Sequence, residues 1–246
     1  MYTKQNRMKS ENKVLVIGGY RGIGNKLAKL YLYNGDQVFV TYSRLKPKGY
    51  KSKNISFLKL ELNNHRKFVI FIKKLKKIKF DIVLFVAAVN ANSKGIRKKY
   101  CMWNNLSIVE FAKMLSINCF SHIKILEYMM KKKLLNTKAK IIFFSSIASS
   151  IHNRGKLKHN KKGGDLVYRI SKAALNVAVK NIAYDFSNTD YTFIAIHPGW
   201  VRTRSGGKNA NLSISYVSKK IFDVIKGLKS KDTGKFLNYD GRTIRW

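Results

Sequence analysis

The chain has 246 residues, 45% of them hydrophobic, and its 50 Lys and Arg against 12 Asp and Glu give a formal net charge of +38. This apolar content supports a buried core and excludes a disordered protein. No apolar run approaches the ~18–20 residues needed to cross a bilayer, so we expect no membrane insertion.

The two cysteines, Cys101 and Cys119, are too few for a disulfide framework, and no residues near them have metal-ligand spacing. The five histidines form no ligand-spaced cluster with Cys or carboxylates, so we expect no metal site. The N-terminus is polar and basic without an apolar stretch behind it, which is not typical of a signal peptide. We expect a cytoplasmic protein in which residues 1–12 form a flexible N-terminal extension.

The positive charge is distributed along the whole chain, in pairs such as Lys73-Lys74 and Lys98-Lys99, with no RNA-binding motif, zinc-finger motif or basic tail. Two interpretations stay open. The charge forms a solvated basic surface, which we favour, or it binds a polyanion at low salt. In either case we expect no specific nucleic-acid partner.

Short, nearly continuous apolar runs alternate with longer amphipathic runs. The short runs are typical of strands buried on both faces of a sheet, and the longer runs of helices. This alternation predicts an α/β protein with a doubly wound parallel sheet (Rossmann fold) in three α/β/α layers, as a single domain over residues 1–246. The expected strands are 13–17, 37–41, 55–60, 81–87, 140–145 and 192–197. The expected helices are 24–33, 65–77, 107–133, 168–186 and 213–228.

A glycine-rich segment with the spacing G-x-x-x-G-x-G follows the first expected strand and precedes the first expected helix. Glycine permits the positive φ of a tight turn and lets a pyrophosphate approach bare backbone at a helix N-terminus. In this position the segment indicates a dinucleotide site, although an ordinary strand-to-helix turn is the alternative. The candidate cofactor-binding residues here are Gly18, Tyr20, Arg21, Gly22, Ile23 and Gly24.

The end of the second expected strand indicates the choice of cofactor. A carboxylate there would bind the ribose 2′-hydroxyl of NAD(H) and repel a 2′-phosphate. No carboxylate occurs between Asp36 and Glu61. Ser43 and Arg44, with Arg21 from the glycine segment, could bind a 2′-phosphate through charge-assisted hydrogen bonds. The sequence therefore favours NADP(H) over NAD(H), with an ordinary surface cation as the alternative for Arg44.

Tyr168 and Lys172 stand four residues apart at the start of an expected helix, on one of its faces. A lysine ammonium beside the phenol, with the positive nicotinamide ring of an oxidised cofactor, would lower the tyrosine pKa. Upstream, a buried strand ends in Ser145-Ser146 at the edge of the sheet where such folds bind ligands. Asn118 lies inside the long expected helix, where Asn is unfavourable unless it serves a purpose.

Together these segments resemble the short-chain dehydrogenase/reductase family, from Lys13 almost to Trp246. The glycine segment, Asn118, Ser146, Y-x-x-x-K and Pro198-Gly199 occur in the order of that family. Within it, the chain is similar to the branch of sniffer-type carbonyl reductases and bacterial C-signal proteins. The supporting stretches are Gly163-Gly164 shortly before YRISKAALN, then HPGWVRT and the terminal GKFLNYDGRTIRW.

The resemblance implies four catalytic residues. Tyr168 would protonate the carbonyl oxygen as hydride arrives from the nicotinamide, and Ser146, with Ser145 as the competing choice, would hydrogen-bond that oxygen. Lys172 would lower the tyrosine pKa and hold the nicotinamide ribose, and Asn118 would hold a water that links Lys172 to solvent as a proton relay. The further cofactor contacts that the resemblance implies are Glu61, Leu62, Ala87, Ala88, Pro198, Gly199, Val201 and Thr203.

Three departures from the family pattern stand out. Ile17 replaces a frequent Thr and removes a hydrogen bond of the glycine loop. The segment 85–88 reads F-V-A-A instead of N-N-A-G. It lacks the asparagines that tie this strand to its neighbours. It also has Ala88 at the position where Gly lets the backbone approach the adenosine ribose. Arg204 replaces a frequent Asp in the loop that faces substrate.

The implied function is NADPH-dependent reduction of a small aldehyde or ketone, or the reverse oxidation of an alcohol. The alternative is a protein of the C-signal type that keeps the dinucleotide fold, has little or no activity and signals through a partner; the F-V-A-A segment adds weight to it. The resemblance also implies a homodimer or homotetramer, built on the Tyr168 helix and the long helix that holds Asn118.

Overall fold

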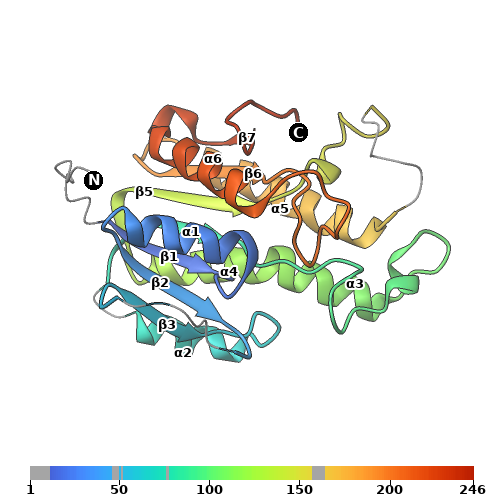
Figure 1. Cartoon of the computed structure of the whole chain (residues 1–246), viewed down its shortest axis with the longest axis horizontal. Helices are drawn as coiled ribbons and strands as arrows, with labels where there is room; N and C mark the ends of the chain where they lie inside the picture. Colours follow the sequence, from blue (N-terminus) through green and yellow to red (C-terminus); the bar gives the residue numbers. More distant parts are fainter. Residues whose placement is uncertain (1–11, 46–49, 51, 76–77, 157–163) are drawn as a thin grey trace, which may run out of the picture.

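The computed structural model describes residues 12–45, 50, 52–75, 78–156 and 164–246. Most of the expected N-terminal extension, residues 1–11, lies outside this part of the chain, and so does Gly163. Seven parallel strands form one sheet in the order β3-β2-β1-β4-β5-β6-β7 (Figure 1). The strands are β1 (Lys13–Ile17), β2 (Gln37–Tyr42), β3 (Ile55–Lys59), β4 (Phe80–Phe85), β5 (Leu135–Phe144), β6 (Thr192–His197) and β7 (Lys235–Asn238).

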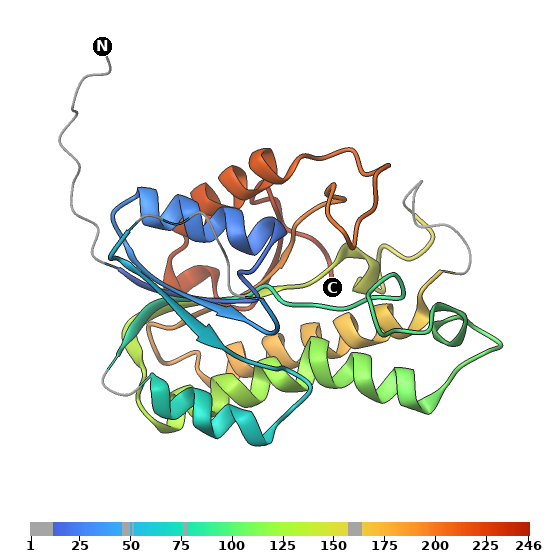
Figure 2. The same ribbon diagram turned by 60° about the horizontal axis from the view of Figure 1, so that its bottom comes forward.

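Helices cover both faces of the sheet (Figures 1 and 2). They are α1 (Gly22–Tyr33), α2 (Arg66–Lys74), α3 (Ile108–Leu115), α4 (Ser121–Lys131), α5 (Leu166–Asp185) and α6 (Ile214–Gly227). Helices α1 and α6 lie side by side on one face, and α2, α4 and α5 lie on the other (Figure 2). The expected doubly wound, three-layer α/β/α fold is confirmed.

Strand β1 shows why the central strands are apolar at nearly every position. Val14 and Val16 pack into the core on the side of α1 and α6, and Leu15 and Ile17 pack into the core on the opposite side. All four are fully buried. Because successive strand residues point to opposite faces and both faces are covered, the positions after Lys13 are apolar on both sides.

Three strands differ from the expected ones. Strand β7 was not predicted, because four residues are too few to give a periodic pattern. Strand β5 begins at Leu135 rather than at residue 140, since its first half is polar and partly exposed. Strand β3 is only half-buried, because it is the edge strand of the sheet.

The long helix expected over residues 107–133 is interrupted. Helices α3 and α4 are joined by a π-helical segment, Ser116–Phe120, with Asn118 at its centre. Such segments insert one residue into a helix and occur often at functional sites. The Asn that looked out of place in a helix therefore marks a local change of helix geometry.

The sheet has its switch point at β1. The chain leaves β1 toward β2 and β3 on one side and returns as β4 on the other side. In parallel α/β folds, ligands bind at the carboxyl ends of the strands at such a switch point. The glycine segment follows β1 and the F-V-A-A segment ends β4, so both lie at this end of the sheet.

Candidate active site

The glycine segment forms a tight turn into the N-terminus of α1. Gly18 has φ +93°, and a Cβ on it would lie 2.7 Å from the backbone of Ala87. A Cβ on Gly24 would lie 2.6 Å from the carbonyl oxygen of Gly18, so any other residue would push the turn apart. The first turn of α1 has no acidic residue and no side-chain cap. Its backbone N–H groups are therefore available to an anion, which fits the diphosphate of a dinucleotide.

A residue on β2 replaces the loop hydrogen bond that Ile17 cannot make. The backbone N–H of Gly18 donates to Oγ1 of Thr41, at 2.9 Å, and Thr41 is buried. The carbonyl of Ile17 in turn accepts from the N–H groups of Val86 and Ala87, at 2.9 and 3.0 Å. Backbone hydrogen bonds thus hold the F-V-A-A segment against β1 without the asparagines of the family pattern.

The carboxyl ends of β2 and β3 bring Arg44 and Glu61 together. Ser43 and Arg44 are exposed after β2, and Arg21 is exposed at the start of α1. Lys67 lies 2.9 Å from the Glu61 carboxylate, and its hydrogen bond lowers the pKa of Glu61. Partial burial opposes this shift. The positive charges of Lys67, Lys59 and Arg44 lower the pKa further. Glu61 is therefore a stable carboxylate with cations around it.

Tyr168 and Ser146 meet at the carboxyl end of β5. Tyr168 lies in the first turn of α5, with its hydroxyl near the Ser146 side chain. Burial raises the pKa of Tyr168 to about 12; the nearby Ser146 side chain opposes this rise and the charge of Asp165 adds to it. The groups of the chain itself do not produce the lowered pKa that the sequence led us to expect. They keep the phenol protonated at neutral pH.

Lys172 lies one turn further along α5, with its side chain fully buried. Its ammonium donates to the carbonyl oxygen of Phe144 at the end of β5, at 2.6 Å. Burial lowers the pKa of Lys172 to about 7, and the nearby Cys119 opposes the shift. The lysine is therefore able to take up and release a proton close to neutral pH.

The two serines after β5 have different surroundings. The Ser145 hydroxyl is buried and donates to Oδ1 of Asn176 at 2.5 Å, and Asn176 donates to the hydroxyl of Ser149 at 2.8 Å. Ser145 is therefore part of an internal network that fixes α5 to the strand end. Ser146 is partly exposed, its hydroxyl accepts from the N–H of Ala148 at 3.2 Å, and it lies near Tyr168, which favours Ser146 over Ser145 as a substrate contact.

Asn118 holds the chain that follows β4. Its side chain accepts from the N–H of Val89 and donates to the carbonyl of Val89, both at 2.8 Å. It also donates to the hydroxyl of Ser171, at 3.0 Å, and Ser171 donates to the carbonyl of Tyr168 at 2.8 Å. Both amide hydrogens are used in these bonds. A proton relay through Asn118 would therefore use its backbone carbonyl in the π-helical segment, not its side chain.

Asp165 is a residue of the site that the sequence reasoning missed. It is the N-cap of α5: one carboxylate oxygen accepts from the N–H of Tyr168, at 2.9 Å. The other oxygen accepts from the N–H of Ala91, at 2.5 Å. Asp165 therefore ties the start of the Tyr168 helix to the loop after β4. The spacing D-x-x-Y before an apolar helix is an N-cap signal and could have shown this.

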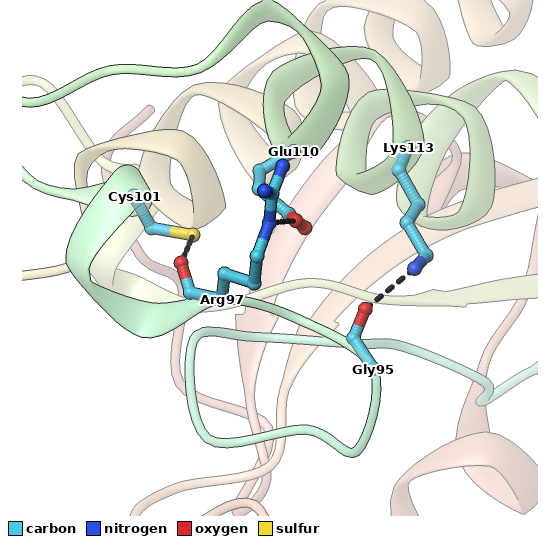
Figure 3. Close-up of polar contacts among 5 residues, drawn as sticks. All are labelled: Gly95, Arg97, Cys101, Glu110 and Lys113. Atoms are coloured by element: carbon cyan, nitrogen blue, oxygen red, sulfur yellow. Dashed lines mark hydrogen bonds and ion pairs between the residues drawn. The ribbon is translucent and has the colours of Figure 1, made fainter.

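The segment between β4 and α3 is fixed to α3 by polar contacts (Figure 3). Arg97 donates to the buried carboxylate of Glu110 at 2.7 Å, and Lys113 donates to the carbonyl of Gly95. Cys101 is buried beneath them, and burial, with the charges of Asp165 and Glu110, raises the pKa of its thiol to about 11. A small apolar cluster also holds this segment against Tyr168, with Ala91, Cys101, Met114 and Val167 as its buried members.

The turn after β6 lies near the glycine segment. Gly199 has φ +81°, and a Cβ there would lie 2.4 Å from Leu212. The Cγ2 atom of Thr203 lies 3.7 Å from the position of a Cβ on Gly22. This turn therefore approaches the glycine segment, so that candidate cofactor residues after β1 and after β6 lie opposite each other. Val201 is buried in the same turn.

Within the described residues, no three or more His, Cys, Asp or Glu side chains converge as a metal site would require. In the same part of the chain, no helix has the length and hydrophobicity of a membrane span.

Comparison with known proteins agrees with this geometry. The family model of short-chain dehydrogenases matches residues 12–211. The C-signal of Myxococcus xanthus is 28% identical over 155 residues, which span 63% of this chain and 90% of that protein. A short-chain dehydrogenase/reductase from Burkholderia multivorans with bound NADP has a TM-score of 0.80 at 25% identity, over 96% of this chain and 100% of that one. The carbonyl reductase Sniffer of D. melanogaster has a TM-score of 0.79 at 25% identity, with the same coverage. The chain belongs to the short-chain dehydrogenase family of NAD(P)-dependent oxidoreductases.

Proposed function

We propose that the chain reduces small aldehydes or ketones with NADPH, or oxidises the corresponding alcohols in reverse. The observation that carries this proposal is the convergence of three side chains at the end of β5: Tyr168 lies near Ser146, and Lys172 lies one turn along the same helix, bonded to the carbonyl of Phe144. The likeness to Sniffer, named a carbonyl reductase, supports the substrate class.

In this proposal Tyr168 is the general acid. A bound NADPH supplies the hydride. A carbonyl oxygen that accepts a hydride gains negative charge, and it needs a proton donor and a hydrogen-bond donor within reach. Tyr168 keeps its proton at neutral pH because burial raises its pKa to about 12, and the Ser146 hydroxyl lies next to it. Tyr168 gives up the proton, and Ser146 stabilises the charge that develops on the oxygen.

Lys172 and Asn118 serve the return of the proton. The pKa of Lys172, lowered to about 7 by burial, is close to the pH at which the enzyme would work. In our proposal Lys172 holds the nicotinamide ribose, favours the phenolate of Tyr168 when charged, and passes a proton toward solvent through a water at Asn118.

The cofactor that we propose is NADP(H) in preference to NAD(H). Three side chains that could bind a 2′-phosphate are exposed at this edge: Ser43 and Arg44 after β2, and Arg21 in the glycine segment. Among the described residues of this edge, the one nearby carboxylate is Glu61, and it is paired with Lys67. The Burkholderia multivorans relative with bound NADP supports this choice. The remaining contacts would come from Leu62, Ala87, Ala88, Pro198, Gly199, Val201 and Thr203 together with the glycine segment.

We also propose that residues 1–246 act as a single domain in a homodimer or homotetramer, in the cytoplasm. Large apolar side chains are exposed on the outer faces of α3 and α5, among them Ile108 at 77%, Val177 at 63% and Tyr184 at 79%. Apolar side chains exposed to this extent favour an interface between copies. Both cysteines are free thiols, which fits a reducing compartment.

The experiment that tests the proposal measures NADPH consumption over a panel of aldehydes and ketones. Wild type is compared with Ser146→Ala and with Ser145→Ala. We expect turnover by wild type, a loss of kcat of about 10–1000-fold in Ser146→Ala, and a smaller loss in Ser145→Ala, which affects packing of α5. Absence of turnover with every compound would favour the alternative, a non-catalytic protein of the C-signal type.

A further inference from the structure

A cleft of about 670 Å³ begins one residue after Ser146. Its walls come from three separate parts of the chain. Ile147 and His152 belong to the segment after β5, Gly199 and Trp200 to the turn after β6, and Arg242 and Arg245 to the tail after β7. Figures 1 and 2 both show the C-terminus beside the segment that follows β5. The volume lies in the range of small-molecule sites.

The backbone of Arg245 is fixed at the wall of this cleft. Its carbonyl accepts from the hydroxyl of Ser150, at 2.5 Å. Its two neighbours are also anchored: the N–H of Ile244 donates to the carbonyl of Phe236 at 2.7 Å, and the Trp246 ring stacks on the Phe236 ring at 5.3 Å. The guanidinium is exposed, on a backbone that is already ordered. The backbone at this position therefore needs no further ordering when the side chain binds a ligand.

The charges around the cleft are mainly positive. Arg242 is neutralised by Asp240, with nitrogen to oxygen distances of 2.7 and 2.9 Å. The Arg245 guanidinium has no ion pair or hydrogen bond within the described part of the chain. Lys156 lies 3.1 Å from the ring of His152, and partial burial, then the charges of Lys156 and Arg245, lower the pKa of His152. A cation is therefore left without a partner beside a wall of Ile147, Trp200 and Leu212.

We propose that this cleft binds the anionic end of the substrate, with Arg245 as its partner. The substrate class is then an aldehyde or ketone that carries a carboxylate on an apolar or aromatic body. A guanidinium binds a carboxylate with two parallel hydrogen bonds, and the apolar wall contacts the body of the molecule. The proposal rests on the proposed function, because it needs the carbonyl to lie at Tyr168 and Ser146.

The test compares a matched pair of substrates, para-carboxybenzaldehyde and its methyl ester, which differ in charge and little in size. We expect wild type to have a kcat/KM at least about tenfold higher for the acid, as one charge-assisted hydrogen bond allows. Arg245→Ala should lose this preference and keep its kcat/KM for the ester. Arg245→Lys should keep part of it, and Arg66→Ala, which removes an exposed charge at the start of α2, should change neither value.

The outcomes separate the two proposals. If wild type reduces both compounds equally, or if Arg245→Ala lowers both values alike, the cleft does not select an anion, and the reductase function stands. If neither compound is reduced, calorimetry with NADPH present tests whether the cleft binds an anion. It measures the dissociation constants of the acid and the ester for wild type and for Arg245→Ala. Tighter binding of the acid that depends on Arg245 would support the cleft, and equal binding would overturn it.

Discussion

Replacement of Asp165 by Ala should destabilise the protein at the start of the Tyr168 helix. The variant loses the N-cap bond to the N–H of Tyr168, which is worth about 1 kcal/mol. It also leaves the N–H of Ala91, a residue only 6% exposed, without its 2.5 Å acceptor, at a cost of about 1–3 kcal/mol. The sum is about 2–4 kcal/mol. Burial raises the pKa of Asp165, so the wild type carries a desolvation cost that alanine removes, and we expect the lower end of this range.

The assay is urea unfolding followed by circular dichroism, with hydrogen exchange at the amides of Ala91 and Tyr168. Asp165→Asn should lose less stability than Asp165→Ala, because an Asn side chain still caps a helix. Asp223→Ala breaks an exposed pair with Lys219 on α6 and should cost no more than about 1 kcal/mol. If Asp165→Ala unfolds with the wild-type free energy and both amides keep their protection, Asp165 does not hold this part of the site.

Three further predictions follow from charges and burial. NADPH should bind more tightly than NADH by about 1–3 kcal/mol, and Arg44→Asp should shift the preference toward NADH; equal dissociation constants in wild type would contradict this. DNA binding should be independent of sequence and should disappear steeply with added salt, whereas tight binding well above physiological salt would refute a dispersed basic surface. His122 is fully buried, and burial, then the charge of Lys172, hold its pKa well below 6.5. As the pH falls, the imidazole of His122 takes up a proton in the unfolded chain before it does so in the folded protein, and this favours unfolding. Between pH 7.5 and pH 5, wild type should therefore lose about 2 kcal/mol of stability relative to His122→Phe. An identical pH dependence in both proteins would rule out this origin.

The fold followed from the sequence because its main signals are local. Buried strands such as Lys13–Ile17 and Thr192–His197 are apolar at nearly every position, and the structure has them with these bounds. Strand β7 escaped notice because a four-residue edge strand depends on its partner β6 rather than on its own pattern. The π-helical segment at Asn118 was also missed, and the partner that Asn118 bonds there, Val89, lies far away in sequence.

The candidate site was predictable where a residue type stands at a diagnostic spacing. Tyr168, Lys172 and the serine pair are of this kind, and the structure brings them to one end of β5. The spacing could not predict the direction in which the pKa of Tyr168 is shifted. The sequence suggested that Lys172 lowers the pKa of Tyr168, but the ammonium is bound to the carbonyl of Phe144 and burial has the larger effect. The contacts that decide this come from elements distant in the chain.

The supporting residues of the site were not predictable from their own positions. Thr41 replaces the hydrogen bond lost at Ile17, and it lies on β2, away from the glycine segment in sequence. Arg245 gains its proposed role only because the tail after β7 is fixed beside the segment that follows Ser146. Both depend on which loops the parallel sheet brings to the same edge.

The central claim is that Tyr168 donates the proton to the carbonyl oxygen, and Tyr168→Phe tests it most directly. The change removes only the phenol hydroxyl, so kcat/KM for NADPH-dependent carbonyl reduction should fall at least about 1000-fold while the dissociation constant for NADPH stays within about threefold of wild type. The activity of wild type should also decline at high pH as the phenol loses its proton. Near-full activity in Tyr168→Phe, with cofactor binding unchanged, would contradict the assignment.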